Sequence, residues 1–129
     1  TFAYDELLKF PQRFESLSQS AGARFYILLI PSRSMVFRRF INPDMKHSPP
    51  EEFFAKRGLP YHPELLDFER SWRKLIHICS QLKNTTCIDA LPAARELGEN
   101  FFYPEDDHPS VKGQQVLAEL LENNRQFQQ

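Results

Sequence analysis

The sequence has 129 residues, of which 41% are hydrophobic and 26% are charged, and its formal net charge is −1. This length suits one domain with a single core, and the composition is that of an ordinary globular protein. The near-zero charge excludes an electrostatic case for binding nucleic acid or an anionic membrane. No apolar run approaches the roughly 18 residues that a membrane-spanning helix requires, and no signal peptide is visible.

The first half of the chain predicts a helix followed by a buried strand. Residues 4–21 have helical spacing of apolar residues, Pro11 is expected to break or restart the helix, and Gly22 stands at the position of a C-terminal cap. The continuous apolar run RFYILLIP at 24–31 predicts a strand buried on both faces, as in a parallel sheet. Residues 32–47 show no sustained period and predict a long loop.

The second half predicts further helices and one more strand. Ser48 is expected to cap a short helix whose first position is Pro49, with Glu51 completing the capping box, and which ends at Gly58. The longest helix is predicted over about 63–82. CIDAL at 87–91 predicts a second short buried strand. A small helical segment, an acidic loop and a final helix follow it.

The two strands have the pattern of parallel strands, which predicts an α/β sandwich. A parallel sheet of only two strands leaves unpaired edges and an exposed face. We therefore expect additional strands, supplied by a missing N-terminal part or by a second copy of the chain.

Two other sets of residues leave structural alternatives open. Cys79 and Cys87 lie eight residues apart, a spacing that suits neither a zinc site nor a CxxC motif. Two small buried thiols are favoured, and a disulfide is the alternative in an exported protein. Several phenylalanines fall outside the predicted core stripes and either complete the core or form an interface. They are Phe37, Phe40, Phe53 and Phe54.

The acidic run Glu105-Asp106-Asp107 ends at His108, just before the last predicted helix. A histidine that acts as a general base needs a carboxylate to fix its tautomer, and both Asp106 and Glu105 have workable spacings. The structural alternative is a charged turn, because helix starts attract acidic residues. A metal site is disfavoured, since adjacent residues rarely converge on one ion.

Three segments together resemble the SGNH/GDSL hydrolases. YPEDDHPS at 103–110, followed by Gly113 and a helix that carries Ala118, is similar to their last conserved block, in which Asp and His stand one or two residues apart. RFYILLIPSRSMVF at 24–37 resembles the strand and polar stretch of SGNH-like domains of polysaccharide O-acetylation. CIDALPAARELG at 87–98 resembles the strand and short helix before the catalytic block.

This resemblance implies a three-layer α/β/α sandwich of flavodoxin-like type that hydrolyses or transfers an acyl ester of a saccharide or lipid, with no metal and no cofactor. In that family a serine attacks the ester. His108 would be its general base and Asp106 would orient the histidine, with Glu105 as the alternative carboxylate. The relatives concerned with polysaccharide acetylation are periplasmic or extracellular, or associated with the membrane.

The family's nucleophile is the part that this sequence lacks. None of the four glycines begins a Gly-Asp-Ser or G-x-S-x-G motif, and no oxyanion block is recognisable. Ser32 and Ser34, at the end of the first strand, are the serines best placed for a site. We therefore expect the chain to be the C-terminal portion of an SGNH domain whose N-terminal strands and serine precede it.

Alternatives to catalysis remain open at this level. A non-catalytic α/β domain that keeps the SGNH-like shape would act as a binding or interaction module. Tyr61, His62 and Asp89 could line a site by position, but His62 is interpreted as a helix-start residue and Asp89 as a polar group at a strand end.

Overall fold

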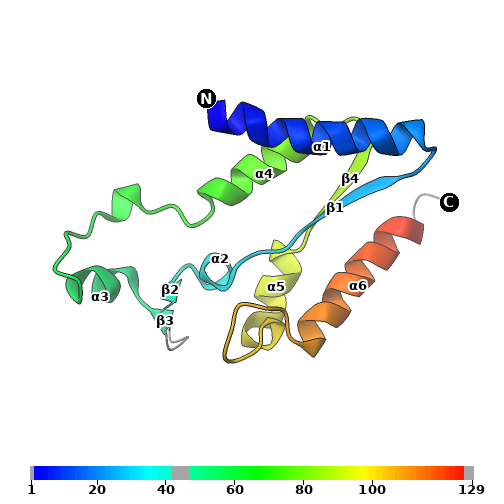
Figure 1. Cartoon of the computed structure of the whole chain (residues 1–129). Helices are drawn as coiled ribbons and strands as arrows, with labels where there is room; N and C mark the ends of the chain where they lie inside the picture. The colour runs from blue at the N-terminus through cyan, green and yellow to red at the C-terminus, as the bar shows by residue number, and fades with distance from the viewer. Residues whose placement is uncertain (1, 42–46, 127–129) are drawn as a thin grey trace.

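The structure is a computed structural model that describes residues 2–41 and 47–126, and 58% of it is helical. Figure 1 shows the elements in chain order. They are α1 (Phe2–Ser20), β1 (Phe25–Leu29), α2 (Arg33–Phe37), β2 (Phe40–Ile41), β3 (His47–Ser48), α3 (Pro50–Ala55), the 3-10 helix η1 (Pro63–Leu65), α4 (Arg70–Ser80), β4 (Thr85–Asp89), α5 (Leu91–Leu97), the 3-10 helix η2 (Gly98–Phe101) and α6 (Val111–Gln126).

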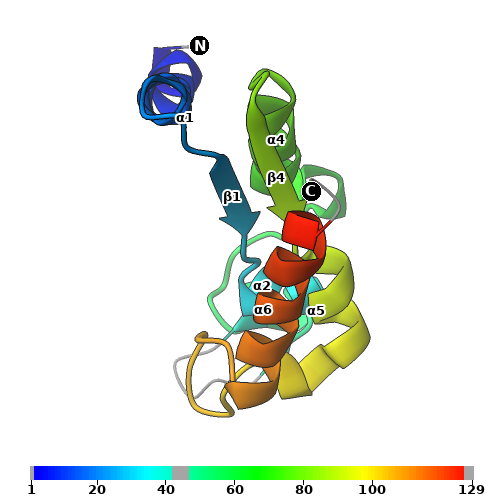
Figure 2. The ribbon, with the colours of Figure 1, turned by 90° about the vertical axis from the view of Figure 1, so that its right-hand side faces the viewer.

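The two predicted strands pair with each other in parallel. β1 and β4 lie side by side, with Phe25 opposite Thr85 and Leu29 opposite Asp89 (Figure 2). A separate antiparallel pair, β2 with β3, has two residues in each strand. The parallel pairing expected from the apolar runs is therefore confirmed.

The expected three-layer, flavodoxin-like α/β/α sandwich is wrong. The described residues form two separate two-stranded sheets among helices, so no wide sheet exists for helices to cover. The reason lies in the sequence between β1 and β4, which carries no third apolar run of strand length. That segment instead folds into helices and the small β2–β3 pair. The β2–β3 pair and α3 lie away from the main sheet, whereas α4 returns to it (Figure 1).

Helices lie on both faces of the β1–β4 sheet. Successive side chains of a strand point to opposite faces. Ile27 and Leu29 line a hollow together with residues of α1 and α4. Tyr26 lines a hollow on the other face together with residues of α6.

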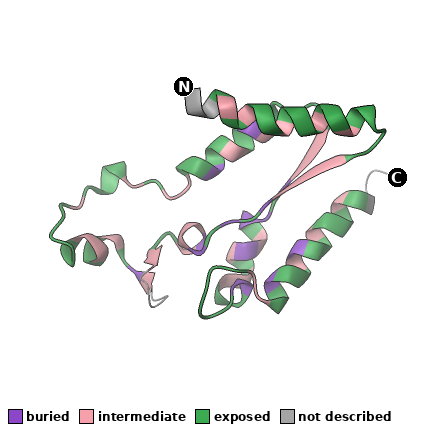
Figure 3. Cartoon of the chain, in the orientation of Figure 1, coloured by how far each residue is buried: buried purple, intermediate pink, exposed green. Residues whose placement is uncertain are grey.

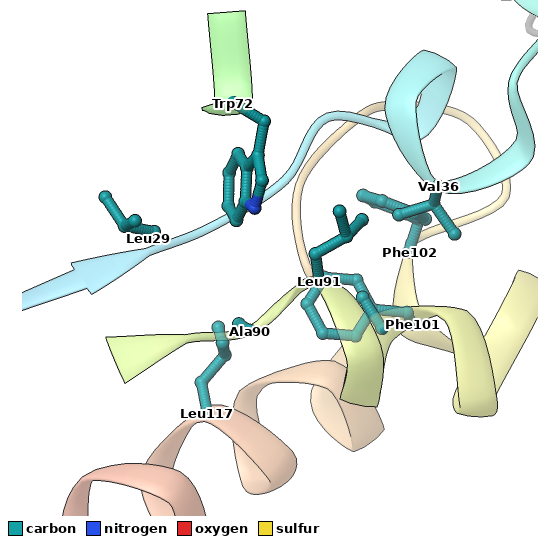
Figure 4. Close-up of a cluster of buried hydrophobic side chains, with 9 residues drawn as sticks. Leu29, Val36, Trp72, Ala90, Leu91, Phe101, Phe102 and Leu117 are labelled. Carbon is teal, nitrogen blue, oxygen red and sulfur yellow. The ribbon is translucent and has the colours of Figure 1, made fainter. Parts of the chain in front are cut away.

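The core gathers at the carboxyl ends of the two strands, where α2, α5 and α6 meet (Figure 4). Phe101 and Phe102 are 0% and 2% exposed, and burial of a phenylalanine side chain contributes about 1.5–3 kcal/mol. The remaining buried members are Leu29, Val36, Trp72, Ala90, Leu91, Ala94 and Leu117. The acidic loop starts directly after Phe102, so its base joins the buried core.

Two expectations about α1 have different outcomes. Gly22 has a φ of +64°, in the left-handed region that suits a glycine cap, and this prediction is confirmed. Pro11 does not break the helix, because α1 is continuous from Phe2 to Ser20. The apolar side chains of α1 are largely exposed, as Figure 3 shows for the helix as a whole; they include Leu7, Phe10, Phe14 and Leu17.

The other predicted helices are shorter than expected. The helix expected over 63–82 is interrupted: after η1 the backbone of Leu66 is extended, and α4 begins only at Arg70. The Asp67 side chain accepts a hydrogen bond from the Glu69 N–H (3.1 Å), a local bond that competes with helix formation. Ser48 does not cap α3, because it lies buried in β3 and Pro49 precedes the helix.

The two cysteines form a disulfide, so the favoured interpretation as free thiols is wrong. Cys79 in α4 and Cys87 in β4 are bonded, with Cα atoms 6.0 Å apart. Helical α4 lies against β4 and brings together two side chains that sequence spacing alone leaves unrelated. The disulfide links α4 covalently to β4.

The phenylalanines outside the predicted stripes pack mainly against one another. Phe40 stacks on Phe53 with ring centroids 4.1 Å apart, and its edge contacts involve Phe54 and Phe68. Phe37 instead lies 6.3 Å from Phe102 at the edge of the main core. A second cluster of half-buried rings therefore lies around α3, separate from the core. Its members are Phe40, Phe53, Phe54 and Phe68.

Candidate active-site loop

The acidic loop connects η2 to α6 and is closed at its base by backbone hydrogen bonds. Phe102 and Pro109 form an isolated antiparallel bridge, and the Tyr103 N–H donates to the His108 carbonyl (3.0 Å). The Ser110 N–H donates to the Phe101 carbonyl (2.8 Å). The loop is therefore a narrow turn whose two ends are held together above the buried phenylalanines.

Within this turn, Asp106 contacts His108 in two ways. Its Oδ1 accepts the His108 backbone N–H at 2.8 Å and lies 3.3 Å from the ring atom Nδ1. The backbone N–H lowers the pKa of Asp106, and the His108 ring and the charge of Arg33 lower it further. A carboxylate at Nδ1 leaves Nε2 on the opposite side of the ring, and the His108 side chain is 83% exposed.

The other two carboxylates of the loop have different surroundings. Asp107 Oδ1 lies 3.4 Å from Arg33 Nε, within ion-pair range. Glu105 is exposed, and the contacts of His108 described here involve Asp106 and not Glu105. The geometry thus selects Asp106 from the two carboxylates that the sequence left open.

Arg33 is a residue of the site that the sequence reasoning missed. It begins α2, directly after the exposed N-cap Ser32, and its side chain is 3% exposed. Its guanidinium donates to the backbone carbonyl oxygens of Tyr103 and Asp106. The available signal was a charged residue between a buried strand and the apolar Met-Val-Phe, but nothing local shows which segment it contacts.

Ser110 and Gly113, which carry part of the SGNH resemblance, have structural roles here. The Ser110 hydroxyl accepts from the Gly113 N–H (3.1 Å) and donates to the Asn100 carbonyl, as a helix N-cap does. A Cβ on Gly113 would lie 2.2 Å from the Phe101 carbonyl oxygen. Only glycine allows α6 to approach the loop base this closely.

The two candidate serines at the end of β1 do not complete a triad. Ser32 caps α2, its oxygen accepting from the Met35 N–H at 3.4 Å. The Ser34 carbonyl accepts the N–H of Arg38 at the other end of the same helix. Within residues 2–41 and 47–126, neither hydroxyl is hydrogen-bonded to His108.

The remaining candidate residues lie apart from the loop. His62 precedes η1 and its Nδ1 lies 3.2 Å from Glu64, while Tyr61 packs against Phe54. Asp89 accepts the N–H of Leu91 (2.8 Å) at the start of α5. His62 and Asp89 thus occupy the structural roles that the sequence favoured for them.

The loop borders a hollow but does not face into it. This hollow has a volume of about 320 Å³ and is lined by residues that include Phe102, Tyr103 and Lys112, but by neither Asp106 nor His108. No group of three potential metal-ligating side chains occurs among the described residues, and none of the described helices could cross a bilayer. The loop therefore presents an aspartate–histidine pair on an open surface.

Comparisons with protein-family models, curated proteins and solved structures found no significant match to this chain.

Proposed function

We propose that this chain supplies the histidine base and its aspartate partner to a serine esterase or O-acyltransferase of the SGNH type. The observation that carries the proposal is the contact between Asp106 Oδ1 and His108 Nδ1 at 3.3 Å, with Nε2 directed away from the carboxylate. The substrate class is an acyl ester of a saccharide or lipid.

In the proposed mechanism, Asp106 keeps the proton of His108 on Nδ1, so that the lone pair of Nε2 can accept a proton. Nε2 takes the proton of a serine hydroxyl as the serine oxygen bonds to the acyl carbon. It then returns that proton to the departing alcohol when the ester bond breaks. Water or a second alcohol attacks the acyl-serine in the same way, which gives hydrolysis or transfer. The serine comes from a segment outside this sequence.

Two further observations support this proposal. The loop base is held on the core, which limits how far the pair moves relative to the rest of the molecule and favours catalysis by positioning. The Cys79–Cys87 disulfide is typical of proteins in oxidising compartments, where enzymes that act on exported polysaccharides also work.

The test is ester hydrolysis by the protein expressed from its complete coding sequence, measured with p-nitrophenyl acetate and with acetylated oligosaccharides. H108A is expected to lower kcat by about 10²- to 10⁴-fold, the usual contribution of a general base. D106N is expected to lower kcat less, while E105Q leaves it near the wild-type value because Glu105 does not hold the ring.

The chain offers a matched control for this experiment. His62 and Glu64 form a surface pair with an Nδ1–Oε1 distance of 3.2 Å, close to that of the loop pair. H62A should leave hydrolysis unchanged. Equal losses in H62A and H108A, or no loss in H108A, would contradict the proposed function.

A second candidate is the non-catalytic interaction module. The exposed apolar residues of α1 favour it, since Phe10 is 68% and Leu17 58% exposed, and the hollow between α1, β1 and α4 is lined by apolar side chains. Full ester hydrolysis in a folded H108A variant would favour this candidate over the first.

A further inference from the structure

Arg33 is the one buried charged side chain among the described residues, and it lies under the acidic loop. A guanidinium cannot lose its proton in a protein, so burial is costly unless every partner is in place. The partners of Arg33 all come from residues 99–107, about 70 positions further along the chain. Because the buried charge of Arg33 has all these partners in one segment, we infer that it helps to fix the conformation of the acidic loop.

The guanidinium fixes the backbone of the turn. Nη2 donates to the carbonyl oxygens of both Tyr103 and Asp106, the latter at 2.9 Å. Nη1 donates to Glu99 at 3.3 Å, and the guanidinium carbon lies 5.0 Å from the centre of the Phe102 ring. One rigid group thus holds two carbonyls three residues apart. A lysine ammonium, which is a single point of donation on a flexible stem, does not reproduce this geometry.

The same guanidinium also separates the two aspartates. Its Nε lies 3.4 Å from Asp107 Oδ1, whereas Asp106 Oδ1 receives the His108 N–H and lies beside Nδ1. Two adjacent carboxylates could each approach the imidazole from a mobile loop. Nε makes no hydrogen bond among the described residues, so its contact with Asp107 is an ion pair alone. This ion pair leaves Asp106 as the partner of His108.

We propose that Arg33 is a positioning residue that fixes the loop so that Asp106, and not Asp107, holds Nδ1 of His108. The catalytic consequence rests on the proposed function, but the arrangement itself does not. Arg33 acts through the loop and does not touch the substrate.

The experiment uses nitrogen NMR of His108 in the full chain, with the R33K and R33Q variants. Wild type is expected to hold the neutral imidazole in the Nδ1–H tautomer, which donates to Asp106, whereas free imidazole side chains prefer the Nε2–H form. R33K should shift the tautomer toward Nε2–H. It should also speed hydrogen exchange of the His108 amide by about tenfold or more, because that N–H is released from Asp106.

Arg38 provides the matched control. It lies next to the C-terminus of α2, is exposed, and pairs with Glu69. Its side-chain hydrogen bonds and ion pair among the described residues involve Glu69 and not the acidic loop. R38Q should leave both the tautomer and the amide exchange of His108 unchanged. The single substitution D106N should abolish the preference of His108 for the Nδ1–H tautomer, while the single substitution D107N should preserve it.

Three outcomes would overturn the inference. They are a wild-type tautomer and exchange rate in R33K, an equal effect of D107N and D106N in wild type, and loss of the folded state in both R33K and R33Q. The last result would mean that Arg33 holds the fold at large instead of positioning this loop.

The readout also separates this inference from the proposed function. If H108A keeps full esterase activity while R33K still shifts the tautomer, the proposed function fails and the role of Arg33 stands. If both hold, R33K is expected to lower kcat with KM changed less than about twofold, since orientation of the base acts on the chemical step.

Discussion

At the scale of single residues, Glu15 shows how one carboxylate can join two elements that are distant in sequence. It lies on α1 and accepts from the N–H groups of Lys83 and Asn84 and from the Thr85 hydroxyl. The Thr85 hydroxyl makes the largest contribution to lowering the pKa of Glu15 from its ordinary value of 4.5, and the two backbone N–H groups add to it. Glu15 therefore fastens α1 to the start of β4.

We expect E15Q to lower the free energy of unfolding by about 1 kcal/mol, at the low end for a charged hydrogen-bonded group because the site is partly solvated. A carboxyl whose pKa is lowered on folding contributes stability above its unfolded-state value. That contribution is lost as pH falls below about 4.5 toward the folded-state value. In urea unfolding, the difference in unfolding free energy between wild type and E15Q should be largest near neutral pH and should decrease in acid. E6Q, which removes only the exposed Glu6–Lys9 pair, should show no comparable effect.

Asp106, His108 and Arg33 show which contacts of the site could be predicted from the sequence and which could not. Asp106 and His108 are two positions apart, so their contact depends on one turn and was predictable from local chemistry. Arg33 meets the same loop about 70 residues away, and that contact depends on how β1 and β4 pair. The contact of Arg33 with Asp107 depends on the same distant pairing, so the sequence alone does not show it.

At the scale of elements, α6 depends on Gly113 for its place beside the loop. A Cβ there would meet the Phe101 carbonyl oxygen at 2.2 Å, and that oxygen also accepts the Ser110 N–H. Alanine favours helix over glycine by about 1 kcal/mol, but a clash with rigid backbone in a packed core costs typically 1–3 kcal/mol. At this separation, the cost of the steric clash exceeds the gain in helix propensity.

We therefore expect G113A to be destabilised by about 1–2 kcal/mol in urea unfolding, with the largest NMR shifts at Phe101 and Ser110. A118G, at an exposed position of the same helix, provides a control that tests helix propensity alone. A G113A variant more stable than wild type would show that α6 can move aside without cost.

Element boundaries were predictable where a single local signal dominates. The apolar run at 24–31 contains the strand at 25–29, and Gly22 has the left-handed backbone of the predicted cap. The second strand lies at 85–89, two residues before the predicted 87–91, because Ala90 and Leu91 belong to the start of α5. The start of α4 was not predictable, because the apolar spacing continues through Leu66 while a side-chain bond of Asp67 competes with the helix. The flavodoxin-like sandwich failed for a similar reason: two strand signals do not reveal how many strands the sheet contains.

At the scale of the whole molecule, the disulfide acts on the unfolded chain as well as on the fold. Cys79 and Cys87 close a loop with a sequence separation of eight. In the chain-entropy account, a loop of this size contributes about 2.5 kcal/mol to stability. The net stability of a domain is only about 5–15 kcal/mol, so this contribution is a large share of the total.

We expect the reduced protein, or the C79A/C87A variant, to unfold at a lower urea concentration, with a loss of about 2–3 kcal/mol. Addition of dithiothreitol should shift the unfolding midpoint of the wild type and leave that of C79A/C87A in place. Identical midpoints for oxidised and reduced wild type would contradict this expectation.

The parallel pairing of β1 with β4 has a consequence for the order in which the molecule forms. Phe25 pairs with Thr85, which lies 60 positions further along the chain, and contacts of such long range form slowly because a large loop must close first. The turn with Asp106 and His108, in contrast, is closed by bonds between neighbours such as Phe102 and Pro109. The aspartate and histidine can therefore meet early in folding, and the turn becomes fixed only when the late closure of the sheet brings Arg33 beneath it.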